Sequence, residues 1–161
     1  MATSTQINRA RQCLASIANG LNAINMKYDR NDRDFCLEFR ARSHQGLTLD
    51  ILIHVLPAHE VVEYYFITDI AVPANRYTDV AMAVCCANNA MLIGGFECTA
   101  DDEYLCFKIS DDYSESYPGR ETVRQTMLLG GDMVDNYGDY FYKLCRGTMK
   151  LKQFLAVVAA R

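Results

Sequence analysis

The stretch that decides the fold runs from Asn75 to Ser110 and reads NRYTDVAMAVCCANNAMLIGGFECTADDEYLCFKIS. Apolar residues in its first half recur three and four positions apart, which predicts one buried face of a helix. The predicted buried stripe is Tyr77, Val80, Val84, Ala87 and Met91. We expect Asn75 to cap this helix and Gly94-Gly95 to end it, because these residue types favour helix starts and stops.

The second half of the stretch predicts a β-hairpin. Residues 96–98 and 104–109 are rich in apolar and aromatic residues, and the acidic turn Asp101-Asp102 separates them. Aspartates favour turns because their side chains bond to nearby backbone groups. The stretch is therefore expected to set a helix against a sheet and to return the chain into that sheet.

Upstream, the sequence predicts one helix and three strands. The helix over residues 6–26 has an apolar stripe at helical spacing. Residues 35–40, 47–54 and 61–72 instead alternate apolar and polar positions, which is typical of strands with one face in water. The connections between these strands are too short for a crossover helix, so we expect an antiparallel meander.

Downstream, the most regular pattern in the chain predicts a long helix over residues 119–145. Its stripe steps by four and three residues, a spacing typical of a helix packed along another helix: Val123, Met127, Gly130, Val134, Tyr137, Phe141 and Leu144. Gly130-Gly131 allows two interpretations, a close backbone approach within one helix or a break between two helices. A last short helix is predicted from Leu151, Leu155 and Val158.

The predicted order of elements is α-β-β-β-α-β-β-α with an extra helix at the C-terminal end. Strands that cluster between helices indicate an α+β fold, with one antiparallel sheet and helices packed on one face. A chain of 161 residues fits one domain. We expect a single domain over residues 1–161, with a core over 5–146 and the extra helix over 147–161.

Composition and charge are those of a globular protein. Half of the residues are apolar, 22% are charged, and the net charge is −4. The acidic balance argues against nucleic-acid binding, which normally leaves a basic patch. No segment approaches the ~20 apolar residues of a membrane span, and the N-terminus lacks the apolar run of a secretory signal. We therefore expect a cytoplasmic protein that binds neither nucleic acid nor a membrane.

Four short motifs give the chain a resemblance to a known family. They are Cys86-Ala87-Asn88-Asn89, Gly95-Phe96-Glu97, Leu105-Cys106-Phe107-Lys108 and Val134-Asp135-Asn136-Tyr137. Together with the order of elements, they resemble the YbjN-like family of bacterial domains, which are labelled sensory transduction regulators and share the fold of type III secretion chaperones. The resemblance implies a chaperone-like or regulatory domain that binds a protein or peptide, often as a homodimer. The resemblance implies no catalytic residue in this chain.

No catalytic or metal-binding motif is recognisable among the chemically versatile residues. The seven cysteines show no CxxC or CxxH spacing, so we expect all of them to pack as small buried hydrophobes. No metal-ligand spacing relates the three histidines, His44, His54 and His59. No calcium-loop pattern relates the acidic groups, which include Asp132, Asp135 and Asp139. We expect neither a metal nor a cofactor.

Ten tyrosines are the unusual feature of the composition. Tyrosine offers a large amphipathic surface and is enriched at protein interfaces. We expect an interface to use the tyrosine-bearing face of the 119–145 helix or an exposed strand edge. The predicted interface residues are Tyr64, Tyr137, Tyr140, Phe141 and Leu144.

The sequence leaves functions of different classes open. The preferred hypothesis is a non-enzymatic chaperone-like or regulatory domain that binds a protein or peptide partner, as a homodimer. The alternative is a small-ligand-binding or enzymatic domain with a pocket between the sheet and the 119–145 helix, in which Tyr137, Asp135 and His54 are the first residues to inspect. A nucleic-acid-binding regulator is a third hypothesis, which the acidic charge disfavours.

Overall fold

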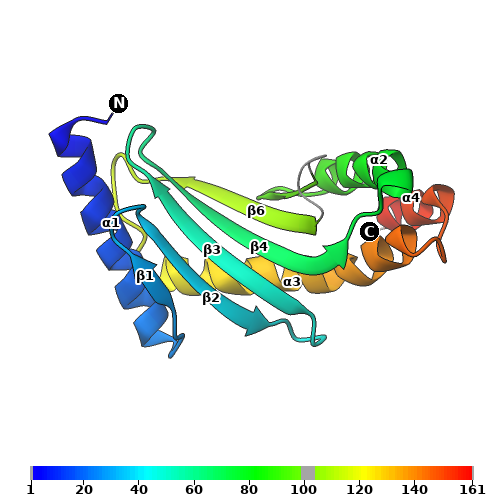
Figure 1. The fold of residues 1–161 in the computed structure, drawn as a ribbon, viewed down its shortest axis with the longest axis horizontal. Helices are drawn as coiled ribbons and strands as arrows, with labels where there is room; N and C mark the ends of the chain where they lie inside the picture. Colours follow the sequence, from blue (N-terminus) through cyan, green and yellow to red (C-terminus); the bar gives the residue numbers. More distant parts are fainter. Residues whose placement is uncertain (1, 99–103, 161) are drawn as a thin grey trace.

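The computed structural model describes residues 2–98 and 104–160. The described residues form one antiparallel sheet of six strands in the order β1-β2-β3-β4-β6-β5, with helices packed on one face (Figure 1). The predicted α+β class is thus confirmed. In chain order the elements are α1 (Ser4–Ala23), β1 (Asp29–Asn31), β2 (Cys36–Arg42), β3 (Thr48–Leu56), β4 (Val61–Ala71), the 3₁₀ turn η1 (Ala74–Arg76), α2 (Tyr77–Asn89), β5 (Gly95–Glu97), β6 (Tyr104–Asp112), α3 (Arg120–Cys145) and α4 (Leu151–Ala159).

The three central strands form the predicted meander. β2, β3 and β4 pair antiparallel in sequence order, and β6 pairs with the far side of β4. Successive side chains point to opposite faces of a sheet, and the face toward the helices carries apolar residues that are at most 4% exposed: Leu49, Ile51, Ile53, Val62, Tyr64 and Phe66. The other face has no helix over it in the described part of the chain (Figure 1).

The long helix α3 runs unbroken through Gly130 and Gly131 for 26 residues, which decides between the two interpretations of this pair. A Cβ atom added to Gly130 would lie 2.1 Å from Cζ of Phe66 on β4, well inside contact distance. The aromatic ring therefore lies directly on the helix backbone, in the space that any other residue would fill. The prediction of a close backbone approach is confirmed, and the predicted break is wrong.

All seven residues of the predicted α3 stripe are buried. The spacing predicted that α3 packs along another helix, and this is confirmed only in part, because α3 contacts β4 and β6 as well as α1, α2 and α4. α3 lies across β4 and β6, α1 crosses its start, and α2 and α4 pack near its end (Figure 1). The regular spacing thus identified the buried side of the helix correctly, but it did not distinguish a sheet from a helix as the surface that buries it.

An aromatic cluster joins the C-terminal part of α3 to β5, β6 and α4. The ring of Phe96 lies 5.1 Å from Phe107 and 4.9 Å from Phe141, measured between centroids. Phe141 in turn lies 4.8 Å from Phe154 of α4, whose side chain is fully buried. Aromatic pairs at such separations add to the stability gained from burial. The extra C-terminal helix therefore contributes directly to the core.

Local differences from the sequence predictions have identifiable causes. Asn75 lies in the 3₁₀ turn η1, and no side-chain cap starts α2, so the predicted cap is wrong. α2 ends at Asn89, before the glycines. The side chain of Asn88 accepts a hydrogen bond from the Phe96 N–H (2.8 Å) and donates one to its carbonyl (3.0 Å). This amide holds β5 against the end of α2.

The ends of the sheet also differ in detail from the prediction. Residues 29–31, between the predicted first helix and the first predicted strand, form the short edge strand β1 beside β2. The predicted turn at Asp101-Asp102 lies outside the described residues. The strands on either side of it pair as the hairpin prediction requires, with Phe96 opposite Phe107.

The two neighbouring glycines of α3 give a matched test of the close approach. Gly130→Ala is expected to lower the free energy of unfolding by about 2 kcal/mol, because the new methyl group overlaps the Phe66 ring. Gly131→Ala is expected to raise it by up to about 1 kcal/mol, because open space surrounds that position and alanine favours the helix. Urea unfolding measures both. Equal effects of the two substitutions would contradict the packing described here.

Candidate functional site

Most of the residues predicted to form an interface lie inside the domain. Tyr64, Phe141 and Leu144 are fully buried, and Tyr137 is 6% exposed; only Tyr140 of the predicted set is half-buried. The regular spacing that singled out the α3 residues reports burial against the chain's own sheet. A protein partner that binds the folded domain would therefore have to contact side chains other than these four buried ones.

The three residues proposed for a pocket do not converge. Asp135 is 8% exposed, and its Oδ1 accepts a hydrogen bond from the Gln45 N–H at 3.2 Å, which holds the β2–β3 hairpin against α3. Tyr137 packs its ring 5.7 Å from that of Phe96. His54 points to the opposite face of the sheet, opposite Cys36 and Glu63 in the strand register. No shared site results.

The described residues contain no group of three or more metal-ligating side chains. The three histidines are spread over the β2–β3 hairpin, strand β3 and the β3–β4 turn. Asp132, Asp135 and Asp139 also do not act together, because Asp135 is buried and Asp139 forms an ion pair of 2.5 Å with Lys143.

The cysteines fall into buried and accessible groups. Cys13, Cys36 and Cys145 are buried, as predicted, whereas Cys85 is exposed and the remaining three are half-buried. Burial, with a further contribution from Asp111, raises the pKa of Cys13 to about 12. Burial and the nearby Cys98 thiol raise the pKa of Cys145 to about 11. The prediction that all seven are buried is therefore wrong at Cys85, which lies on the outer side of α2.

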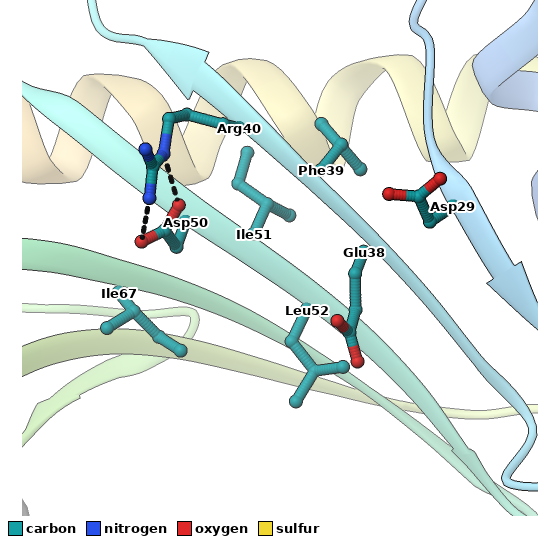
Figure 2. A pocket seen from close by; sticks show the side chains of 8 residues that line it. All are labelled: Asp29, Glu38, Phe39, Arg40, Asp50, Ile51, Leu52 and Ile67. Carbon is teal, nitrogen blue, oxygen red and sulfur yellow. Dashed lines mark hydrogen bonds and ion pairs between the residues drawn. The ribbon is translucent and has the colours of Figure 1, made fainter.

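A shallow hollow of about 500 Å³ opens on the uncovered face of the sheet (Figure 2). Within it Arg40 donates two hydrogen bonds to Asp50, of 2.7 and 3.0 Å, and this contact lowers the pKa of the Asp50 carboxyl. Both side chains are more than half exposed, so their pairing adds little stability. We call this feature the sheet-face hollow; its lining is Asp29, Glu38, Phe39, Arg40, Asp50, Ile51, Leu52 and Ile67.

Further along the same face, the charges also pair within the chain. Lys108 forms ion pairs of 2.8 Å with Glu63 and 3.7 Å with Glu97. The Tyr65 hydroxyl donates a 2.5 Å hydrogen bond to Glu63. Burial and then this bond raise the pKa of Tyr65 to about 12. Burial alone would raise the pKa of Glu63, but the hydrogen bonds from Lys108 and Tyr65 hold it below its ordinary value. These contacts therefore stabilise the charged forms of Glu63 and Lys108 and the neutral form of Tyr65.

An apolar groove of about 560 Å³ lies between α3 and the loop that joins α2 to β5. On its loop side, the Leu92 side chain is fully exposed (102%) and Ile93 is 59% exposed. On its helix side lie Leu129 and Met133, which are half-buried. We call this the α3 groove; its lining is Ala90, Met91, Leu92, Ile93, Leu129, Met133, Asn136 and Tyr137.

A third hollow, of about 270 Å³, lies between the sheet and the other flank of α3. It is bounded by Ile24 and Met26 after α1, by residues 41–44 of the β2–β3 hairpin, and by Arg124, Leu128 and Gly131 of α3. We call it the edge slot. It lies where the alternative hypothesis expected a pocket, between the sheet and the long C-terminal helix, but none of Tyr137, Asp135 and His54 lines it.

Comparison with known proteins identifies the fold. The solved structure of YbjN, a candidate transcription regulator from E. coli, is similar to this chain with a TM-score of 0.54, covering 82% of this chain and 87% of that chain. The chain has a YbjN-like fold. The two sequences are 11% identical, so the likeness establishes the fold alone. No protein-family model matches the chain, and no curated protein does.

The structure exposes two apolar residues, Leu92 and Ile93, for which the sequence predicted no role. Leu92 and Ile93 stand in an apolar run between the α2 pattern and Gly94-Gly95. Met91 was predicted to belong to the helix stripe, but α2 ends at Asn89, and no role was predicted for Leu92 or Ile93. A signal was present, since large apolar residues beyond a helix end need either a core or a partner. Only the three-dimensional structure shows that no part of the described chain covers them.

The thiols should react in the order of their exposure. At pH 8, an alkylating reagent is expected to modify Cys85 first and to leave Cys13 and Cys145 unmodified until the protein unfolds. The cause is that only the thiolate reacts, and burial both blocks access and raises the pKa of these two thiols. Peptide mapping after timed alkylation gives the order. Rapid modification of Cys13 in the folded protein would contradict it.

The buried Tyr64 hydroxyl has no hydrogen-bond partner among the described residues. Tyr64→Phe is therefore expected to leave the free energy of unfolding unchanged or to raise it by about 1 kcal/mol, because an unpaired buried hydroxyl is costly. Tyr65→Phe is the control, with an expected loss of about 1 kcal/mol, because it removes the bond to Glu63. Urea unfolding measures both, and a clear loss in the Tyr64 variant would show that its hydroxyl is paired.

Proposed function

We propose that this chain is a non-enzymatic, regulatory or chaperone-like domain that binds a protein partner through the α3 groove. The observation that carries the proposal is the full exposure of Leu92 at the mouth of an apolar groove. A contiguous exposed apolar surface of this kind marks an interaction site in a soluble protein. The YbjN-like fold supports a regulatory role, because YbjN itself is described as a candidate regulator.

The chemistry of the groove favours a protein over a substrate. Its lining is apolar apart from Asn136 and the Tyr137 hydroxyl, and it offers no cluster of titratable groups. An active site would need convergent polar groups positioned for reaction. An apolar side chain or the face of an amphipathic helix fits such a surface better, as in helix-in-groove recognition.

A second copy of the chain is the simplest partner. In a two-fold dimer the same patch meets itself, so the patch must be complementary to itself. The α3 groove has both parts of such a contact: Leu92 projects from the loop, and Leu129 and Met133 border a space that a leucine side chain can enter. In the proposed homodimer, Leu92 of each copy inserts into the groove of the other.

Leu92→Asp tests the proposed dimer. The substitution is expected to weaken dimerisation by at least about tenfold, because it removes one buried leucine per copy and places a charge in an apolar contact. Sedimentation equilibrium over a range of concentrations measures the dissociation constant, and thermal unfolding checks that the variant is folded.

Met82→Asp is the matched control, because Met82 is 49% exposed on α2 and does not line the groove. It is expected to leave the dissociation constant unchanged. A wild-type chain that stays monomeric at the highest concentrations would exclude the homodimer. Equal weakening by both substitutions would show that the α3 groove is not the contact.

A further inference from the structure

The outer edge of β2 is open over its second half. β1 pairs only with the first part of β2, from Cys36 to Glu38. On that side of the sheet, no strand of the described chain lies beside residues 39–42, where β2 extends past β1 (Figure 1). An unpaired strand edge is a template to which another strand can add.

The hydrogen-bond pattern shows which backbone groups of this edge are unpaired. The Ser43 N–H donates a bond of 3.0 Å to the Leu47 carbonyl, across the β2–β3 hairpin. In an antiparallel pair, alternate residues of a strand direct their N–H and C=O groups to the same neighbour. The backbone groups of Arg40 and Arg42 therefore point away from β3, and no described residue bonds to them.

The side chains of this edge alternate between two different environments. Arg40 and Arg42 are exposed and point to the uncovered face of the sheet, whereas Ala41 points to the helix side and lines the edge slot. A strand added beside β2 would follow the same alternation. Its residue opposite Ala41 would point into the edge slot, and the residues before and after it would lie beside the two arginines.

The edge slot fits one apolar side chain. Gly131 on its α3 wall leaves space, since a Cβ added there would meet no atom within 4 Å. A leucine side chain needs roughly 120 Å³, at about 30 Å³ for each water-sized group, and the slot offers about 270 Å³. Four side chains make an apolar floor, none of them more than 9% exposed: Leu49, Ile51, Phe66 and Met127.

The charges on the outer face of this edge favour an acidic partner. Arg42 lies opposite Thr48 of β3 and forms no ion pair with a described residue. Arg40 pairs with Asp50 but stays more than half exposed. The two guanidinium groups would repel the same edge of a second copy, because like charges on adjacent strands destabilise their pairing. They match carboxylates, to which arginine can donate paired hydrogen bonds.

We propose that the open edge of β2 binds an extended peptide with an acidic–apolar–acidic sequence, added as an antiparallel strand beside residues 40–42. Backbone hydrogen bonds to Arg40 and Arg42 supply affinity, and the alternate side chains supply specificity. The apolar residue enters the edge slot, and the acidic residues lie beside the arginines. This surface shares no lining residue with the α3 groove, so it is separate from the proposed dimer contact.

The probe is the acetylated peptide amide Ser-Thr-Glu-Leu-Glu-Thr-Ser, called the Leu peptide. The Ser peptide has serine in place of the leucine, and the Lys peptide has lysine in place of both glutamates. Titration calorimetry is expected to show that the Leu peptide binds at least about tenfold more tightly than either control. The Ser peptide tests the contact with the edge slot, and the Lys peptide tests the charge preference.

Amide hydrogen exchange measures the strand pairing itself. In the free protein, the amides of Arg40 and Arg42 are expected to exchange faster than those of Phe39 and Ala41, which bond to β3. A saturating concentration of the Leu peptide is expected to slow exchange at Arg40 and Arg42 by at least about tenfold. A peptide held only by side chains would leave these two amides unprotected.

Matched variants separate the backbone, the charge and the slot. Arg42→Gln and Arg42→Pro both remove the charge, but only proline removes the outward N–H, at an edge position where proline is tolerated. Arg42→Pro is expected to bind the Leu peptide at least about tenfold more weakly than Arg42→Gln. Gly131→Leu fills the slot and is expected to remove the preference for the Leu peptide over the Ser peptide. Gln125→Leu, on the exposed side of α3, is the control and should bind like the wild type.

Melting temperatures check that each variant is folded. The proposal is overturned if the three peptides bind equally, if none binds at millimolar concentration, or if binding leaves exchange at Arg40 and Arg42 unchanged. Protection of these amides that grows with protein concentration, without peptide, would instead assign the edge to a second copy. Leu92→Asp is expected to bind the Leu peptide like the wild type, so a failure of the proposed dimer leaves this test intact.

Discussion

The contact between the Phe66 ring and the backbone of α3 at Gly130 is the constraint on which the rest of the structure depends. It brings a 26-residue helix directly against the middle of the sheet, where any side chain at position 130 would hold the two apart. Because a sheet buries only one face in this arrangement, α3 supplies most of the cover for the inner side of β4 and β6. α1 and the pair α2 and α4 then cover the two ends (Figure 1).

Hollows lie on both sides of the helix. On one flank the 90–93 loop completes the α3 groove, and on the other the β2–β3 hairpin completes the edge slot. The neighbouring glycines reflect this geometry: Gly130 allows the contact, and Gly131 leaves the adjacent flank empty.

The uncovered face of the sheet differs from these hollows because its charges are paired within the chain. Arg40 with Asp50, and Lys108 with Glu63 and Glu97, leave few charges on this face that need a partner. Paired charges of this kind let a sheet face water without exposing a broad apolar surface. The most exposed of the described large apolar side chains, Leu92, lies beside α3 instead, and this is why the proposed function places binding there.

By itself the sequence determined the secondary structure of β3, β4 and α3 and which side of each is buried; in α2 only Val80 and Ala87 of the predicted stripe are buried. Period-two alternation in β3 and β4 and the α3 stripe follow from backbone geometry, and the sheet, the hairpin and the buried side of α3 were predicted from them. Only the tertiary structure decided what those buried faces contact. Periodicity measures the direction of a side chain relative to its own backbone and carries no information on the surface opposite, so it predicted a helix beside α3 and did not predict that the sheet also covers it. The exposure of Leu92 and the open space at Gly131 depend on contacts between distant segments, which no local pattern records.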